Sequence, residues 1–306
     1  MHIPNSMLEG SICPVTAAVS AIGIAVAAYS AIRSDNKPEA ARFGAVTALI
    51  FAGQMMNFPI QNGTSGHLLG GVLAAALLGT PFGVLAMALV VAIQCFVFSD
   101  GGFSVLGANI LNMALIGAGV GGFLRTRFLK SQSVPSFNSA VTLGSIAWLS
   151  VMMAAFACSI ELAVSGTIAF SKVIGAMLGT HGLIGIGEGL ITVGACFLFA
   201  PTVVPASKKW IVAAPLMASV VIATMVSPFA SGFPDGLEWV AEKYQFLHDA
   251  APSFVSPLSD YAVPLISNET IATGLAGFIG VVLTFFVAWG IARLLILSKR
   301  VKALSR

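Results

Sequence analysis

The stretch SICPVTAAVSAIGIAVAAYSAI (residues 11–32) decides the class of fold, because it runs for 22 residues without a charged side chain. A helix needs about 20 consecutive apolar residues to cross the hydrocarbon core of a membrane. The same character extends over the chain of 306 residues, of which 57% are hydrophobic and 9% are charged. Soluble domains carry about 25% charged residues. The sequence therefore predicts an all-α, polytopic membrane protein rather than a soluble globular domain.

About nine apolar segments of this kind follow one another along the chain. They are predicted over residues 11–32, 41–58, 66–79, 82–98, 104–124, 138–163, 182–200, 210–227 and 270–297. The third segment is short and rich in glycine. We expect a broken or partly inserted helix there, because irregular backbone inside a membrane must be buried in protein or line a cavity.

The basic residues predict the orientation of these segments, since lysine and arginine concentrate on the cytoplasmic side. Thirteen of the 15 basic residues follow the first, fifth and seventh segments or end the chain: Arg33, Lys37, Arg42, Arg125, Arg127, Lys130, Lys208, Lys209, Arg293, Lys299, Arg300, Lys302 and Arg306. All of them face the cytoplasm if the N-terminus lies outside, and only Lys172 and Lys243 are then left outside. The prediction is an external N-terminus and a cytoplasmic C-terminus.

The first two residues, Met1 and His2, form a metal chelate by their chemistry. The α-amine of Met1, the backbone amide nitrogen of His2 and its imidazole Nδ1 can bind one metal through fused five- and six-membered rings. Three nitrogens near one plane favour Ni(II) or Cu(II), whereas structural zinc prefers a tetrahedron. Met1 is expected to be retained, because methionine aminopeptidases need a small second residue. Binding displaces the amide proton, so the affinity is expected to fall in acid.

His67 is the candidate for the fourth nitrogen ligand. It follows the stretch NFPIQNGTSG (57–66), whose glycines Gly63 and Gly66 allow backbone to approach a site closely. Ser65 is expected to cap a helix that begins near His67. In the predicted topology, His2 and His67 lie at the same outer boundary of the membrane.

Five stretches carry a resemblance to a known family. MHIP (1–4), NFPIQNGTSGHLLGG (57–71), FSDGGFSVLGANILNM (98–113) and HGLIGIGEGLIT (181–192) resemble the substrate-binding component of nickel/cobalt energy-coupling-factor (ECF) transporters, the CbiM/NikM type. FPDGLEWVAEKYQF (233–246) resembles the separate small component, the CbiN/NikN or PDGLE type. The resemblance implies a CbiM/NikM-like metal-binding component over residues 1–204. It also implies a fused CbiN/NikN-like membrane domain with an extracytoplasmic loop over residues 205–306.

This resemblance implies the substrate-binding subunit of an ATP-driven importer in a bacterial or archaeal plasma membrane. Four nitrogens hold the metal in that family, and the matching motifs assign them here to Met1, His2 and His67. The implied partners are a transmembrane coupling component and cytoplasmic ATPase subunits. The chain has no G-x-x-x-x-G-K-[ST] phosphate loop. We therefore expect ATP hydrolysis in those partners, and neither a catalytic residue nor a cofactor in this chain besides the transported ion.

Other polar residues in the motifs are expected to support the ligands through hydrogen bonds, as commonly seen around bound metals. The candidates are Asn57, Asn109, Asn112, His181 and Glu188. For His181 and Glu188 a direct metal contact stays an alternative, although four nitrogens already fill a planar site. PDGLEW (234–239) has a tight-turn signature, and its acids are expected to attract cations rather than to bind them as ligands.

The predicted cargo is Ni(II), because planar nitrogen coordination favours nickel over cobalt. Co(II) import for cobalamin biosynthesis is the nearest alternative. An intramembrane metal enzyme would need a pattern such as H-E-x-x-H, which the chain lacks. A stand-alone secondary transporter for divalent metals is the alternative from another class, and it would show internal repeats with binding at the membrane midplane. The histidines instead gather at one predicted face.

Overall fold

The computed structural model describes residues 1–129, 136–199, 208–247 and 256–304, without the side chains of residues 208 and 296–304. Lys130, Arg306 and the predicted domain boundary between residues 204 and 205 lie outside the described residues. The boundary therefore stays a prediction.

The described chain is mainly helical. The α-helices are α1 (Ile12–Arg33), α2 (Ala40–Gln54), α3 (Gly71–Leu78), α4 (Thr80–Ile93), α5 (Leu106–Ile110), α6 (Gly121–Phe128), α7 (Phe137–Val164), α8 (Phe170–Phe199), α9 (Lys208–Val221), α10 (Gly236–Lys243) and α11 (Glu269–Leu304). Three π-helical stretches, η1 (Gln94–Phe98), η2 (Leu111–Val120) and η3 (Ile222–Val226), and two short 3₁₀ turns, η4 (Ser227–Phe229) and η5 (Ser259–Tyr261), continue or connect them. The strands β1 (Phe58–Pro59) and β2 (Ser65–Gly66) form a small antiparallel pair.

Within the described residues, 7 helices are long and apolar enough to cross a membrane. They span Ile12–Arg33, Thr80–Phe98, Leu106–Phe128, Phe137–Val164, Phe170–Phe199, Lys209–Phe229 and Glu269–Leu295. The prediction of a polytopic helical membrane protein is confirmed. Helix α2 has only 15 residues and α3 only 8, so both fall short of a full crossing. Nine membrane segments and the orientation of the termini therefore stay predictions.

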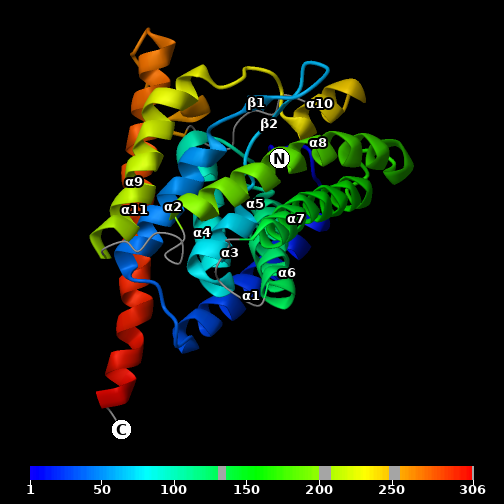
Figure 1. Ribbon diagram of the computed structural model, residues 1–306. Coiled ribbons are helices and arrows are strands. Elements are labelled where there is room, and N and C mark those ends of the chain that lie inside the picture. Colours follow the sequence, from blue (N-terminus) through cyan, green and yellow to red (C-terminus); the bar gives the residue numbers. More distant parts are fainter. Residues whose placement is uncertain (130–135, 200–207, 248–255, 305–306) are drawn as a thin grey trace.

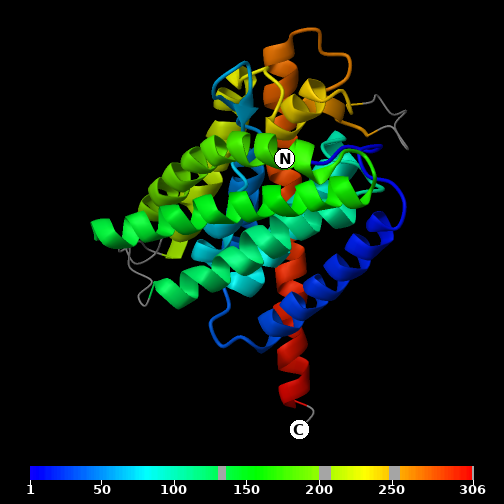
Figure 2. The same cartoon turned by 90° about the vertical axis from the view of Figure 1, so that its right-hand side faces the viewer.

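Helix α2 lies at the centre of the molecule, and its residues 43–54 are all buried. It packs against α9 and α11 on one side and against α4 and α3 on another. Helices α7 and α8 pack on each other and form the other flank, and α1, which packs against α4 and α5, runs lower in the view (Figure 1). A second view shows α11 passing along the bundle and extending beyond it toward the C-terminus (Figure 2).

The polypeptide between α2 and α3 is irregular, and it crosses the end of the molecule opposite the C-terminus. Figure 1 shows β1, β2 and α10 together at that end. Ser65 lies in strand β2, and its hydroxyl donates to the Phe233 carbonyl at 2.8 Å. The expected helix cap at Ser65 is wrong, because α3 begins only at Gly71. The serine instead ties this loop to the segment that leads into α10.

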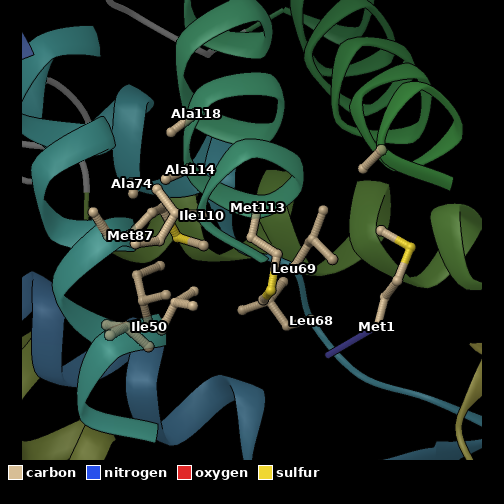
Figure 3. Close-up of a cluster of buried hydrophobic side chains, with 14 of the residues drawn as sticks. Met1, Ile50, Leu68, Leu69, Ala74, Met87, Ile110, Met113, Ala114 and Ala118 are labelled. Atoms are coloured by element: carbon tan, nitrogen blue, oxygen red, sulfur yellow. The ribbon is translucent and has the colours of Figure 1, made fainter. Parts of the chain in front are cut away.

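The N-terminal residue anchors in the hydrophobic core. The Met1 side chain is 4% exposed and belongs to the same buried cluster as Leu69 and Met113. Figure 3 shows Met1 at one end of this cluster, next to Leu68 and Leu69. Burying an apolar side chain of this size contributes about 1.5–3 kcal/mol. The terminal amine is thereby held inside the protein instead of being free in solvent.

Candidate metal centre

Met1 at the N-terminus and His67 in the loop before α3 are in direct contact. The Met1 amine nitrogen hydrogen-bonds Nε2 of His67, although 66 positions separate the two residues. The other ring nitrogen of His67, Nδ1, lies 3.0 Å from the Leu68 carbonyl oxygen. A bond of that kind fixes the ring orientation and places the proton on Nδ1. The Nε2 lone pair then points at the amine.

His2 lies beside this pair. Its ring stacks on the His67 ring with 5.4 Å between centroids and 14° between planes. Nδ1 of His2 lies 3.0 Å from Oδ1 of Asp100, and Nε2 lies 3.1 Å from Oε1 of Gln94. Among the described residues, none accepts a hydrogen bond from the His2 backbone amide. Protein oxygens thus hold both ring nitrogens of His2 and one ring nitrogen, Nδ1, of His67.

Asn109 of helix α5 and the loop at Gly101 hold the first residues of the chain in place. Asn109 accepts from the Ile3 amide at 2.8 Å and donates to the Ile3 carbonyl at 3.0 Å, so its amide pairs with the backbone as a neighbouring strand would. Gly101 has φ +88°, and a Cβ there would lie 2.8 Å from Nδ2 of Asn109 and 3.5 Å from Cβ of His2. Glycine is required at this position by both conformation and space.

The C-terminal part of the chain reaches into the same site. Oδ2 of Asp235 lies 2.8 Å from the Met1 amine nitrogen and 3.7 Å from Nε2 of His67. Oδ1 of the same carboxylate accepts from the backbone amides of Leu237 and Glu238 and so caps helix α10. The Pro-Asp-Gly stretch, which has a tight-turn signature in the sequence, leads directly into this helix.

Charges in the site are arranged in pairs. Burial raises the pKa of Asp235, but the Met1 ammonium and His67 outweigh burial, so that its pKa lies well below the usual range. Burial also raises the pKa of Asp100, and the opposing effects of His2 and Tyr261 leave it lowered. Burial first, and then the Met1 ammonium, lower the pKa of His67. The arrangement is two carboxylates facing an ammonium and two imidazoles.

This site offers nitrogen atoms for a divalent ion. The amine of Met1, the amide and Nδ1 of His2, and Nε2 of His67 lie on residues in mutual contact. No group of three or more His, Cys, Asp or Glu side chains suited to a metal occurs in the part of the chain that the structure describes. A metal held here by four nitrogens would use the terminal amine and a backbone amide besides the two rings. For the metal to reach Nδ1, His2 must give up its contact with Asp100.

Comparison with protein families agrees with the family resemblance of the sequence motifs. Residues 2–206 match the family described as CbiM, the cobalt uptake substrate-specific transmembrane region, and residues 209–297 match the PDGLE domain. This chain is a nickel/cobalt transport membrane protein of the CbiM/NikMN family. The resemblance inferred from the sequence motifs is thereby confirmed, as is a multi-pass membrane location.

Individual relatives of this CbiM/NikMN chain carry both nickel and cobalt names. A protein of Archaeoglobus fulgidus provisionally named fused nickel transport protein NikMN is 36% identical over 307 residues, 96% of this chain and 98% of the relative. The cobalt transport protein CbiM of Sorangium cellulosum is 29% identical and covers 63% of this chain and 89% of its own. The crystal structure of a truncated transition metal transporter shares 28% identity and a TM-score of 0.57, over 64% of this chain and 97% of that one. These relatives are named as transport proteins rather than enzymes.

The residues expected to support the ligands form hydrogen bonds with groups other than the two imidazole rings. Asn109 holds Ile3, as described above. Glu188 accepts from the Leu69 amide at 2.6 Å and the Gly70 amide at 2.9 Å, two and three residues after His67. It thus supports the backbone of the ligand loop instead of the ring.

The remaining expected residues form hydrogen bonds with groups outside the ligand set. Nδ2 of Asn112 donates to Glu161 at 2.7 Å. Nδ1 of His181 lies 2.8 Å from the Met177 carbonyl, and Nε2 of His181 is buried without a partner among the described residues. The Asn57 carbonyl accepts from the Ser231 amide at 2.9 Å. None of these hydrogen bonds, of which that of Asn57 is a backbone contact, joins the residue to the Met1 and His67 pair.

The residues that contact the imidazoles and amine were not among the expected ligand supports. They are Gln94, Asp100 and Asp235. Gln94 had a sequence signal, because it is a polar side chain inside the apolar run 82–98. Asp100 and Asp235 lie in the family motifs SDGG and PDGLE. Nothing local in the sequence, however, indicated which atoms they would face.

Proposed function

We propose that this chain is the substrate-binding membrane subunit of an ATP-driven ECF-type importer for Ni(II). In this proposal the ion is held by the amine of Met1, the amide nitrogen and Nδ1 of His2, and Nε2 of His67. The observation that carries it is the direct contact of the Met1 amine with His67 beside the stacked His2 ring. The contact brings the amine, the His2 residue and the His67 ring of distant parts of the chain to one buried place.

Electrostatics supports a cation at this site. Two carboxylates, those of Asp100 and Asp235, lie within 3.0 Å of candidate ligand atoms. A Ni(II) ion bound with a deprotonated amide carries a net charge of about +1, which these carboxylates offset. In the metal-free protein the Met1 amine, the His2 amide and the His2 nitrogen that faces Asp100 carry protons, so metal and proton compete for them.

Nickel is favoured over cobalt by the type of ligands. Four nitrogens near a plane suit Ni(II), and the affinity of nitrogen sites rises from Co(II) to Ni(II). The relatives that share the fused arrangement, from Archaeoglobus fulgidus and Rhodobacter capsulatus, carry nickel transport names. Cobalt uptake is the second candidate, because the CbiM relatives of similar length to the N-terminal part carry cobalt names.

The proposal is tested by titrating the purified chain with Ni(II) and Co(II) in detergent. Adding one glycine ahead of Met1 displaces the amine, and His67→Ala removes the fourth ligand, so each variant is expected to lose high-affinity binding. Met55→Ala, a buried methionine outside the predicted ligand set, serves as the control and is expected to bind like the wild type. Unchanged Ni(II) affinity in the extended chain would refute the chelate.

Coupling to ATPase partners needs a separate experiment. The chain is reconstituted in lipid vesicles alone and together with its coupling component and ATPase subunits. The proposal expects Ni(II) uptake only in the complete assembly with ATP. Sustained uptake by the chain alone would instead support secondary transport.

A further inference from the structure

The His2 imidazole belongs to a closed ring of four hydrogen-bonded side chains. Nδ1 of His2 lies 3.0 Å from Oδ1 of Asp100, whose Oδ2 accepts from the Tyr261 hydroxyl at 2.6 Å. The Tyr261 oxygen accepts from Nε2 of Gln94 at 3.1 Å, and Oε1 of Gln94 lies 3.1 Å from Nε2 of His2. Both ring nitrogens of His2 are therefore reached from Tyr261, one through Asp100 and the other through Gln94.

The chemistry of this ring determines the orientation of the Gln94 amide. A carboxylate only accepts hydrogen bonds, and a tyrosine hydroxyl has one proton to donate. Since that proton goes to Asp100, the Tyr261 oxygen must accept, and only the NH₂ end of Gln94 can donate to it. The carbonyl end of Gln94 then faces His2 and accepts from Nε2–H. This leaves Nδ1 as the ring nitrogen that can bind a metal, once it has given up the proton that faces Asp100.

Tyr261 is held in place independently of its hydroxyl group. Its ring stacks on Phe98, with 4.7 Å between centroids and 20° between planes. The preceding turn is tied to η1 by a hydrogen bond of 2.9 Å from the Leu258 amide to the Val97 carbonyl. Gln94 is the first residue of η1. The turn around η5 and the helix that carries Gln94 are thus one packed unit.

We propose that Tyr261, a residue of the C-terminal PDGLE part, is a positioning residue that directs Nδ1 of His2 to the metal through the Gln94 amide. The inference rests on the proposed function and adds to it a contribution from the second part of the chain. After metal binding, His2 Nδ1 leaves Asp100, but its Nε2–H keeps Gln94 as the acceptor. Tyr261 then acts on the bound state through Gln94 alone.

Tyr261→Phe in the full chain tests the proposal, because it removes the hydroxyl and keeps the ring that packs on Phe98. The Gln94 amide loses its fixed orientation, and Ni(II) affinity is expected to fall about 10- to 100-fold, the usual effect of losing the outer partner of a metal-binding histidine. Tyr244→Phe is the matched control, since Tyr244 lies in the same part of the chain at the end of α10 and outside the ring. Its affinity is expected to equal that of the wild type.

A double-mutant cycle distinguishes positioning from a general structural effect. Gln94→Leu removes the connecting amide, so adding Tyr261→Phe to it is expected to cost no further affinity. A loss in the double variant equal to the product of the two single losses would overturn the proposal. Wild-type affinity in Tyr261→Phe would overturn it as well.

A measurement without metal keeps this inference separate from the proposed function. In the metal-free chain with ¹⁵N-labelled histidine, the His2 signals are identified by their loss in His2→Ala. The Nε2–H resonance of His2 is expected to be protected from exchange in the wild type and to lose that protection in Tyr261→Phe. An unchanged His2 spectrum refutes the role of Tyr261, whether or not the wild type binds nickel.

Discussion

Replacing Glu188 tests how the loop that carries His67 is supported. The Glu188 side chain is 0% exposed, and its two oxygens accept the backbone amides of Leu69 and Gly70. Glu188→Ala leaves both donors without an acceptor inside the protein. Each unsatisfied buried donor costs about 1–3 kcal/mol, so the variant is expected to lose about 2–6 kcal/mol of unfolding free energy.

Glu188→Gln is the finer perturbation. Its amide has one acceptor oxygen and can satisfy only one of the two backbone donors, while its NH₂ group opposes the other. The expected loss is about 1–3 kcal/mol, toward the low end because no charge needs to be buried. Because the His67 ring is oriented by the adjacent Leu68 carbonyl, loosening this backbone is also expected to lower Ni(II) affinity about tenfold.

Glu161→Gln provides the matched control for this substitution. Glu161 is also a buried acid, 3% exposed, but its described partner is Asn112 rather than the His67 loop. A new amide there can still accept from Asn112, so Ni(II) affinity is expected to stay at the wild-type value. Unfolding in denaturant and Ni(II) titration are measured on all variants. Equal stability of Glu188→Ala and wild type, or equal affinities of the two glutamine variants, would refute this account of the loop.

Three further predictions concern protons, the cap of α10 and a helix crossing. Ni(II) affinity is expected to fall as the pH decreases, because binding releases the protons of the Met1 amine, the His2 amide and the His2 Nδ1 that faces Asp100, about three per metal. His67 adds none, since its lowered pKa leaves that ring neutral. Calorimetry in buffers of different ionisation enthalpy that finds two protons or fewer would contradict amide coordination. Asp235→Ala is expected to destabilise α10 by about 0.5–2 kcal/mol and to speed amide hydrogen exchange over residues 236–243. Asp235→Asn retains a capping oxygen and should keep much of the wild-type protection from exchange. Gly71→Ala is expected to cost about 1–3 kcal/mol, because a Cβ there would lie 2.4 Å from the Gly117 carbonyl carbon. Gly175→Ala, where a Cβ meets nothing within 4 Å, should be tolerated in the same unfolding assay.

Much of the fold follows from local patterns in the sequence. The apolar run 11–32 corresponds to α1 (Ile12–Arg33), and the run 138–163 corresponds to α7 (Phe137–Val164). A helix satisfies its backbone hydrogen bonds within the segment, so an apolar run of sufficient length specifies it without reference to distant residues. The predicted end of the segment 41–58 is wrong by a few residues. Helix α2 stops at Gln54, and the following residues form the irregular loop before β1.

The candidate ligands could also be found without a structure. Met1 and His2 form a chelate by covalent connectivity alone, and His67 lies in a motif that the family resemblance relates to them. The sequence thus determined the helical membrane class and the nitrogen atoms available for an ion. Both depend on short-range properties, namely the length of each apolar run and the spacing of donor atoms along the backbone.

Only the tertiary structure decided what surrounds those nitrogens. Asp235 meets the Met1 amine across 234 positions, and Tyr261 reaches His2 through Asp100 and Gln94. Such pairings depend on how each helix is rotated about its axis and how the helices cross. Successive side chains of an α-helix point about 100° apart, so a small change in rotation gives each residue other neighbours. The sequence shows which polar groups are present, and the packing of the helices and loops determines which of them face each other.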